Sequence, residues 1–209
     1  MDSEILDRKR KKLLSQLTFL KKYGFYMAGG TALALQISHR TSLDFDFYTE
    51  KKFNSEKLRQ EFSKRFKEVI ERQKAEDTLI LLVDGLVVSF FRYVYPLINP
   101  LIKIDGVNLA SAEDIAAMKI LAISQRGRKR DFIDIYFLIQ KFSLSQIIEF
   151  TKRKYPMFNI YVGLQGLTYF KDADEDLEKT RYRLLKKVRW SELKKFITLK
   201  VNTFRKSYL

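Results

Sequence analysis

The segment Gly29-Gly30-Thr31, followed by aspartates at positions 44 and 46, constrains this chain more than any other part of its sequence. The paired glycines predict a tight turn from a short strand over 25–28 into an Ala- and Leu-rich helix over 31–38. A strand predicted over 42–48 would then carry both carboxylates. Because residues i and i+2 of a strand point to the same side, Asp44 and Asp46 would aim at one point.

This pattern combines two kinds of ligand. Carboxylate oxygens suit Mg²⁺, and backbone N–H groups at the start of a helix bind anions. A phosphate beside a metal ion favours phosphoryl or nucleotidyl transfer. Each motif also has a plain structural interpretation. The aspartates would sit on the polar face of an exposed strand, and Gly30 or Thr31 would be an ordinary helix N-cap.

Composition excludes several classes of site. The chain has 209 residues, with no cysteine and a single histidine, His39, so disulfides, thiolate catalysis and sites with two histidines are excluded. Hydrophobic residues make up 46% of the chain, enough for a substantial core. The sequence has no apolar run of about 18 residues and no apolar signal segment, so we expect a cytoplasmic protein without a membrane partner.

The chain is strongly basic, with a formal net charge of +15. Basic residues cluster over 8–12, 126–130 and 179–189. Such an excess is typical of proteins that bind RNA or DNA, although it also promotes solubility. It disfavours a small cationic acceptor.

The pattern along the chain predicts an α+β fold, a mixed sheet with flanking helices followed by a helical bundle. Two Asp-Gly pairs, at 84–85 and 105–106, predict hairpins. The soft boundary lies near residue 105, which gives parts 1–105 and 106–209. Strands are expected over 25–28, 42–48, 69–74, 78–83, 86–93, 101–104 and 107–109. Helices are expected over 3–22, 31–38, 54–66, from 111 to a break at Gly127, and over 129–141, 143–154, 157–168, 174–187 and 190–206.

Two blocks of sequence carry a more specific signal. The first runs from Gly29 through Ala-Leu-Ala-Leu to His39-Arg40-x-Ser42-x-Asp44-x-Asp46. The second includes Lys119 and then Arg130-Asp131-Phe-Ile-Asp134. In this order and spacing, over roughly residues 24–196, the chain resembles the AbiEii/AbiGii toxin family of nucleotidyltransferases, within the DNA polymerase beta-like superfamily.

The resemblance implies a nucleotidyltransferase core over 1–105 and a helical part that completes the cleft. It also implies transfer of a nucleotide from a nucleoside triphosphate to an RNA acceptor, with tRNA expected, in a toxin–antitoxin or phage-defence setting with a cognate antitoxin. Asp44 and Asp46 would hold Mg²⁺ or Mn²⁺. Nucleotide contacts are expected from Gly29, Gly30, Thr31, Arg40, Ser42 and Lys119, and Asp134 is the late acidic residue of the catalytic set (Asp44, Asp46, Lys119, Asp134).

Several of these residues have structural alternatives. Lys119 could belong to a solvated basic helix face, with Arg126 two turns later on the same side. Arg40 could bind phosphate or pair with Asp44 or Asp46. Arg130 and Asp134, at i and i+4, could form a salt bridge within one helix. His39 fits a structural position at a helix C-terminus.

The sequence departs from the family pattern in one respect. These transferases usually place a third carboxylate on a later strand, and the strand over 86–93 carries Ser89 there instead. A missing base often lowers the rate about 10²–10⁴-fold. The alternative function is therefore a catalytically degenerate scaffold that binds RNA or protein. A transferase that uses a protein or small-molecule acceptor is a third possibility.

Overall fold

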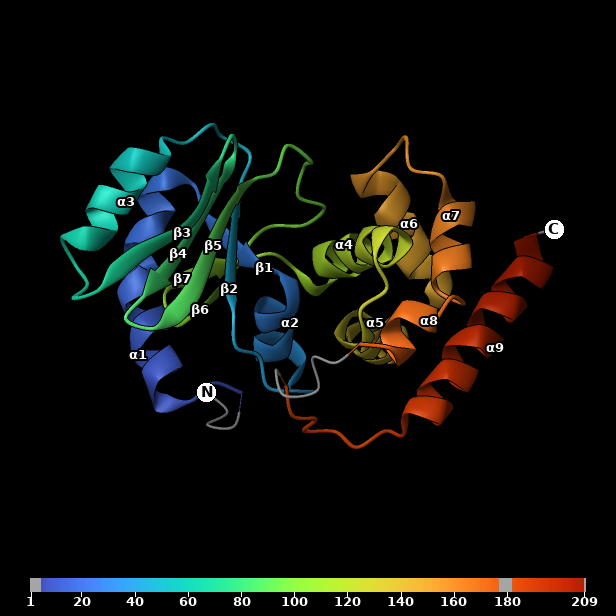
Figure 1. Ribbon diagram of the computed structural model, residues 1–209. Coiled ribbons are helices and arrows are strands. Elements are labelled where there is room, and N and C mark those ends of the chain that lie inside the picture. Colours follow the sequence, from blue (N-terminus) through green and yellow to red (C-terminus); the bar gives the residue numbers. More distant parts are fainter. Residues whose placement is uncertain (1–4, 177–181, 209) are drawn as a thin grey trace.

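The centre of the protein is a seven-stranded mixed sheet with the strand order β3-β4-β5-β2-β1-β7-β6 (Figure 1). The structure, a computed structural model, describes residues 5–176 and 182–208. β1 is parallel to β7 and β2 is parallel to β5, and the other pairs are antiparallel. The strands are β1 (Tyr26–Ala28), β2 (Phe45–Thr49), β3 (Val69–Ala75), β4 (Thr78–Val83), β5 (Leu86–Arg92), β6 (Ile102–Ile104) and β7 (Val107–Leu109).

Both predicted Asp-Gly hairpins are confirmed. Asp84 and Gly85 have φ values of 46° and 76°, and Asp105 and Gly106 have 47° and 79°. Two successive positive φ angles match the two-residue turns whose twist suits antiparallel strands. The second hairpin joins β6 to β7, and β7 pairs with β1, so the sheet extends to Leu109.

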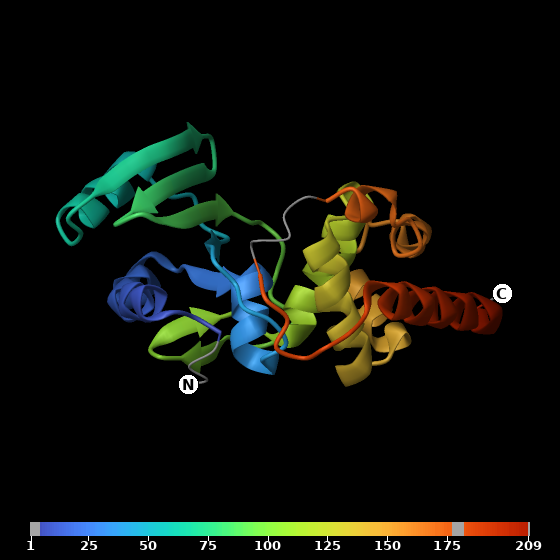
Figure 2. The ribbon, with the colours of Figure 1, turned by 60° about the horizontal axis from the view of Figure 1, so that its bottom comes forward.

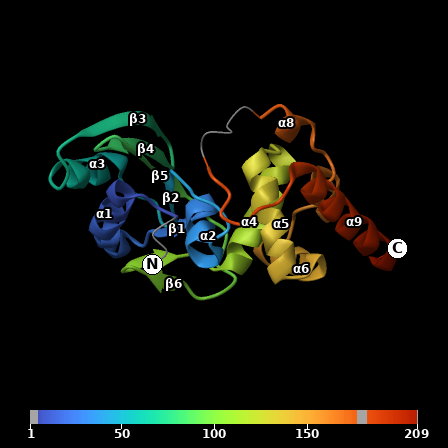
Figure 3. The ribbon, with the colours of Figure 1, turned by 90° about the horizontal axis from the view of Figure 1, so that it is seen from below.

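Helices cover one face of the sheet. On that side lie α1 (Arg8–Gln16), the 3₁₀ helix η1 (Leu17–Tyr23) and α3 (Ser55–Ser63), as Figures 1 and 3 show. Phe62 of α3 packs edge-on against Phe90 of β5, with ring centroids 5.4 Å apart. Gly24, at φ 74°, ends the first helical segment as predicted. The helix predicted over 3–22 begins only at Arg8, with Asp7 as its N-cap, and continues as the 3₁₀ helix η1 from Leu17.

On the other side, α2 (Gly29–Ile37) and α4 (Ala112–Gln125) lie between the sheet and the remaining helices (Figure 3). α4 packs against α5, α6 and α7, and is buried on nearly all sides. Serine N-caps at Ser111 and Ser143 start α4 and α6. The remaining helices are α5 (Lys129–Lys141), α6 (Leu144–Lys154), α7 (Ile160–Gly166), α8 (Lys171–Asp174) and α9 (Trp190–Tyr208).

The helix predicted over 174–187 is wrong over the residues that the structure describes. α8 ends at Asp174, residues 177–181 lie outside the described residues, and 182–189 contain no helix. Instead, segment 182–186 runs beside the end of α2, which Figure 2 shows in orange-red next to blue. Its backbone hydrogen bonds go to residues 39–41 rather than to its own turn. Tertiary pairing therefore overrides the local helical pattern.

None of the helices in the described ranges is long and apolar enough to cross a bilayer. The α+β expectation, with a mixed sheet, flanking helices and a helical second half, is confirmed.

Candidate active site

A cleft lies between the sheet and the helical half, and most of the predicted site residues line it. From the first half these are Gly29, Gly30, Arg40, Ser42, Asp44 and Asp46, and from the second half Lys119. Arg126 and Arg130 add positive charge to the same wall. Of the predicted set, Thr31 and Asp134 are not among the lining residues. Residues about 75 or more positions apart in sequence are thus brought together by α4 packing beside α2.

Asp46 lies within β2, and Asp44 lies just before the strand begins. Burial and the neighbouring Asp44 charge raise the pKa of Asp46 to about 6, although Arg130, Lys119 and a hydrogen bond from Ser89 act in the opposite direction. Burial is the larger cause of this shift, and repulsion between the two carboxylates adds to it. Such a pair fits a hard divalent cation, which would relieve that repulsion.

The strand beside β2 brings a serine next to Asp46. Ser89 of β5 lies directly opposite Asp46 in the parallel register. The sequence prediction that Ser89 occupies this place is therefore confirmed. Among residues 5–176 and 182–208, no group of three or more His, Cys, Asp or Glu side chains is arranged to hold a metal ion. The candidate metal site accordingly rests on Asp44 and Asp46 alone.

The glycine turn approaches its neighbours too closely for a side chain. Gly29 has φ +75°, and a Cβ there would lie 3.2 Å from Asp46 Oδ2. A Cβ on Gly30 would lie 2.3 Å from an Nη atom of Arg40. The helix N-cap is Ala28, so the prediction of Thr31 or Gly30 as N-cap is wrong. Because α2 starts two residues earlier than predicted, the backbone at Gly29 and Gly30 forms both the helix start and the cleft wall.

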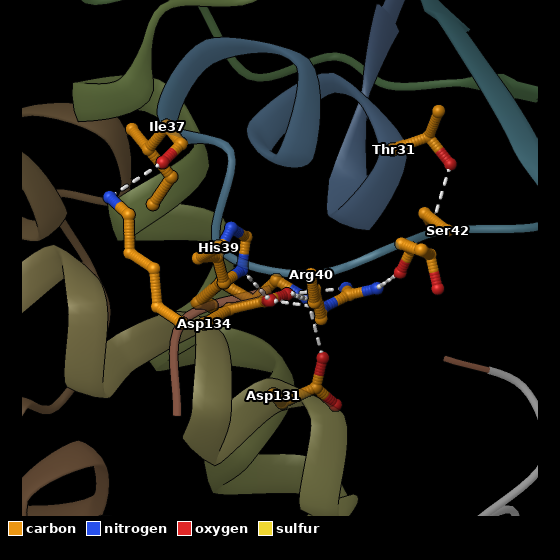
Figure 4. A network of polar contacts seen from close by, with 10 residues as sticks. Thr31, Ile37, His39, Arg40, Ser42, Asp131 and Asp134 are labelled. Carbon is orange, nitrogen blue, oxygen red and sulfur yellow. Dashed lines mark hydrogen bonds and ion pairs between the residues drawn. The ribbon is translucent and has the colours of Figure 1, made fainter. Parts of the chain in front are cut away.

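Thr31 supports the cleft from beneath. Its side chain is buried, and its hydroxyl hydrogen bonds to Ser42 Oγ at 2.8 Å and to the backbone carbonyl of Asp44. The Thr31–Ser42 contact is seen in Figure 4. Thr31 thus positions the segment that carries Asp44, while Ser42 reaches the cleft surface.

Behind the cleft, Asp134 is completely buried in a charged cluster (Figure 4). Its Oδ1 accepts hydrogen bonds from Arg40 Nε and His39 Nε2, each at 2.7 Å, and its Oδ2 lies 3.0 Å from an Arg40 Nη. Burial would raise the pKa of Asp134, but the charges of Arg40 and Lys119 and these hydrogen bonds outweigh it and hold the pKa well below its usual range. Burial lowers the pKa of His39, which is therefore neutral at pH 7.

This cluster corrects two expectations. Arg40 pairs with Asp134 rather than with Asp44 or Asp46. Asp134 pairs with Arg40 and Lys119 and not with Arg130 on its own helix, which was the structural alternative that the sequence left open. His39 has the structural position expected of it, although its partner comes from the second half of the chain.

Lys119 connects the buried cluster to the cleft. Its Nζ lies 2.6 Å from Asp131 Oδ1 and 2.6 Å from Asp134 Oδ2. Burial would lower the pKa of Lys119, but Asp131 and Asp134 outweigh burial and raise it, so the side chain is an ammonium ion. Lys119 is 7% exposed, which rules out the solvated-face alternative. The predicted alignment of Lys119 with Arg126 is confirmed, because both line the cleft.

Segment 182–186, which we call the strap, holds the loop that carries His39 and Arg40. Thr41 N donates to Arg183 O at 2.8 Å, and Arg183 N donates to Thr41 Oγ1 at 2.7 Å. Leu185 N donates to His39 O at 2.9 Å. Apart from the basic cluster over 179–189, of which the structure describes residues 182–189, no sequence pattern predicts this pairing. The strap thus ties the C-terminal half of the chain to the loop that follows α2.

The chain matches known proteins over nearly its whole length. The family model "Nucleotidyl transferase AbiEii toxin, Type IV TA system" matches residues 12–105 and 85–205. An uncharacterized protein from Aquifex aeolicus (strain VF5) is 40% identical over 186 residues, covering 86% of this chain and 87% of that protein.

Two solved structures share the fold. JHP933 from Helicobacter pylori superimposes with a TM-score of 0.62 at 16% identity, covering 97% of this chain and 94% of that one. MenT4, a nucleotidyltransferase toxin from Mycobacterium tuberculosis H37Rv, superimposes with a TM-score of 0.54 at 14% identity, covering 91% and 80% respectively.

Proposed function

Because the chain belongs to the AbiEii family of nucleotidyltransferase toxins, we propose that it transfers a nucleotide from a nucleoside triphosphate to an RNA acceptor, with tRNA as the expected RNA. Family membership supports nucleotidyl transfer itself. The observation that carries the proposal is the meeting of Asp44 and Asp46 with Lys119 and the Gly29–Gly30 turn in one cleft.

Each wall of the cleft suits one part of this reaction. Backbone N–H groups at the start of α2 face the position expected for the triphosphate, and Lys119, Arg126 and Arg130 add positive charge to the same cleft. Asp44 and Asp46 would hold Mg²⁺ or Mn²⁺, which supplies positive charge against the triphosphate. Carboxylates and fixed cations on two sides would orient the α-phosphate between them.

In the proposed reaction, the 3′ oxygen of the RNA forms a bond to the α-phosphorus, and the bond from that phosphorus to the bridging oxygen breaks. Pyrophosphate leaves with that oxygen, and the hydroxyl proton is lost to solvent. The chain's cations stabilise the charge that develops on the phosphate oxygens. The Arg40–Asp134–Lys119 cluster has a positioning role in this proposal, because it fixes Lys119 from behind the cleft.

The test is incubation of the protein with each of the four α-³²P-labelled nucleoside triphosphates, Mg²⁺ or Mn²⁺, and total tRNA. Label is expected on RNA, and Asp44→Ala, Asp46→Ala and Lys119→Ala should each abolish it. Asp105→Asn is the matched control, because it removes a carboxylate in a distant hairpin turn that Asn tolerates. Labelling that persists in both aspartate variants would refute the proposed site.

Ser89 opposite Asp46 favours one alternative, a scaffold that binds nucleotide and RNA without transfer. Its signature would be a nucleotide-dependent rise in melting temperature with no labelled acceptor among RNA, protein and small molecules. The family also implies a cognate antitoxin, and expression toxicity relieved by a neighbouring gene would support it. A nucleotide donor and an RNA acceptor agree with the cytoplasmic setting expected from the sequence.

A further inference from the structure

Helices α1, η1 and α3 cover one face of the sheet. On the other face α2 lies against β1 and β2, whereas Figure 1 shows no helix of the described residues over the strands β4 and β5, and we call this uncovered part the open face. Along β4, Leu79, Leu81 and Val83 are fully buried, whereas the alternate residues are half-buried. Successive side chains of a strand point to opposite faces, so the half-buried positions share the open face. On β5, Phe90 packs against α3, and the next residue, Phe91, is half-buried and points to the opposite, open face.

The open face is continuous with the carboxylates. In the sheet register Tyr48 of β2 lies opposite Phe91 of β5, one row along from the pair Asp46 and Ser89. Adjacent rows on one face are about 7 Å apart. The ring centroids of Tyr48 and Phe91 are 5.4 Å apart at an interplanar angle of 34°. Since Tyr48 also lines the cleft, an aromatic surface begins where the candidate metal site ends.

Two further rings extend this surface. The Tyr48 and Tyr93 centroids are 5.4 Å apart, and the Tyr93 and Tyr95 centroids are 5.1 Å apart. Tyr95 is 39% exposed, so the outermost ring is open to solvent. We call these four side chains, Tyr48, Phe91, Tyr93 and Tyr95, the aromatic shelf. Its rings adjoin one another in a series that leads away from Asp46.

The wall across from the shelf is basic. Arg126, at the C-terminal end of α4, is exposed and lines the cleft together with Tyr48. An aromatic surface beside a cation is the usual chemistry of sites that bind single-stranded nucleic acid.

We propose that the aromatic shelf binds the unpaired 3′-terminal bases of the RNA acceptor by stacking, while Arg126 contacts the phosphates between them. The inference rests on the proposed function, because an RNA 3′ hydroxyl must reach a phosphate held at Asp46. Bases stacked on Phe91 and Tyr95 would deliver that hydroxyl along the open face. Stacking tolerates any base, so the shelf selects an unpaired end rather than a sequence.

The test compares two fluorescein-labelled RNA hairpins, one with an unpaired 3′ end of four nucleotides and one blunt, by fluorescence anisotropy. The wild-type protein should bind the overhang hairpin more tightly. Phe91→Ala should weaken overhang binding about 5- to 150-fold, the range for loss of one stacked base, and leave blunt binding unchanged. Phe91→Tyr, which keeps the ring, should bind as wild type does.

Tyr95→Ala is the second variant and should also weaken overhang binding. Its ring is 39% exposed and lies outside the buried core, so its removal disturbs the fold less than that of a buried ring. Tyr161→Ala removes an exposed ring on α7, away from the cleft, and should change nothing. Equal wild-type affinity for the two hairpins would overturn the proposal. Unchanged overhang binding in a folded Phe91→Ala or Tyr95→Ala protein would also overturn it. If these variants lost only nucleotide affinity, the shelf would bind the base of the nucleotide instead, and the proposal would be wrong.

The two proposals fail differently. Overhang binding that depends on Phe91, without label transfer in any condition, supports the shelf and refutes the transferase function. Transfer to RNA with no dependence on the shelf refutes the shelf and keeps the transferase function.

Discussion

Substitution of Asp134 by Asn tests the charged cluster behind the cleft most directly. Asp134 is 0% exposed and pairs with two cations, Arg40 and Lys119, while Asp131 pairs with Lys119. The native cluster therefore holds two cations and two carboxylates, and its charge sums to zero. Asn is isosteric, so Asp134→Asn leaves the shape unchanged and one buried positive charge uncompensated.

The expected cost follows from this balance. Removing one partner of a buried ion pair typically destabilises a protein by about 3–5 kcal/mol. The free energy of unfolding of an ordinary domain is about 5–15 kcal/mol, so Asp134→Asn should remove a large share of the protein's stability. The double variant Arg40→Met, Asp134→Asn leaves Lys119 with Asp131 and restores neutrality. We expect it to recover at least half of the lost stability, because neutral replacements of buried pairs are often tolerated.

The assay is urea unfolding followed by circular dichroism, comparing midpoints at equal slope. Asp174→Asn is the control, because its ion pair with Lys194 is largely exposed and should contribute far less. A loss below about 1 kcal/mol in Asp134→Asn would refute the argument. A double variant whose loss equals the sum of the two single losses would refute it too, because coupled charges cannot be additive.

The same cluster predicts a pH dependence. The folded-state pKa of Asp134 lies well below its usual range, so the unfolded chain takes up its proton first as pH falls. Its contribution to stability is fully present above about pH 4, the ordinary aspartate range, and is lost as pH falls further through the folded pKa. The stability difference between wild type and Asp134→Asn should therefore be constant from pH 5 to 7 and shrink below about pH 4.

Three other substitutions give independent tests. Gly30→Ala should lower nucleotide affinity, measured by calorimetry, at least about tenfold. Its Cβ would lie 2.3 Å from an Nη of Arg40 and would displace that side chain into the cleft. Unchanged affinity would contradict this close packing. Asp46→Asn should be more stable than wild type at pH 7 in EDTA, by roughly 1–3 kcal/mol. The folded-state pKa of Asp46, about 6, lies above its unfolded value, so the stability of the wild type falls as pH rises through 4 to 6. Thermal melting in EDTA checks this, and Mg²⁺ should then raise the melting temperature of wild type only. Thr41→Val should lower stability in urea unfolding by about 1 kcal/mol, because it removes the 2.7 Å hydrogen bond from Arg183 N to Thr41 Oγ1. Unchanged stability would show that this bond does not anchor the strap.

Most secondary structure was predictable because its causes are local. The Asp-Gly turns at 84–85 and 105–106 require positive φ at both positions, and both hairpins formed where predicted. Serine caps and hydrophobic periodicity likewise placed α4, α5 and α6 within a residue or two. The helix predicted over 174–187 was wrong for the residues that the structure describes after α8. The N–H groups of the strap pair with residues 39–41, and no local sequence pattern predicts such a long-range pairing.

By itself, the sequence determined the local chemistry of this protein, which is the glycine turn at Gly29–Gly30 and the paired carboxylates Asp44 and Asp46. Short spacing fixes those features, since a turn or a strand places neighbours within reach. Only the tertiary structure decided what faces them. The bonds from His39 and Arg40 to Asp134 span 95 and 94 positions of the sequence. The surroundings that shift the pKa values of Lys119 and Asp46 likewise form only when the two halves of the chain pack together.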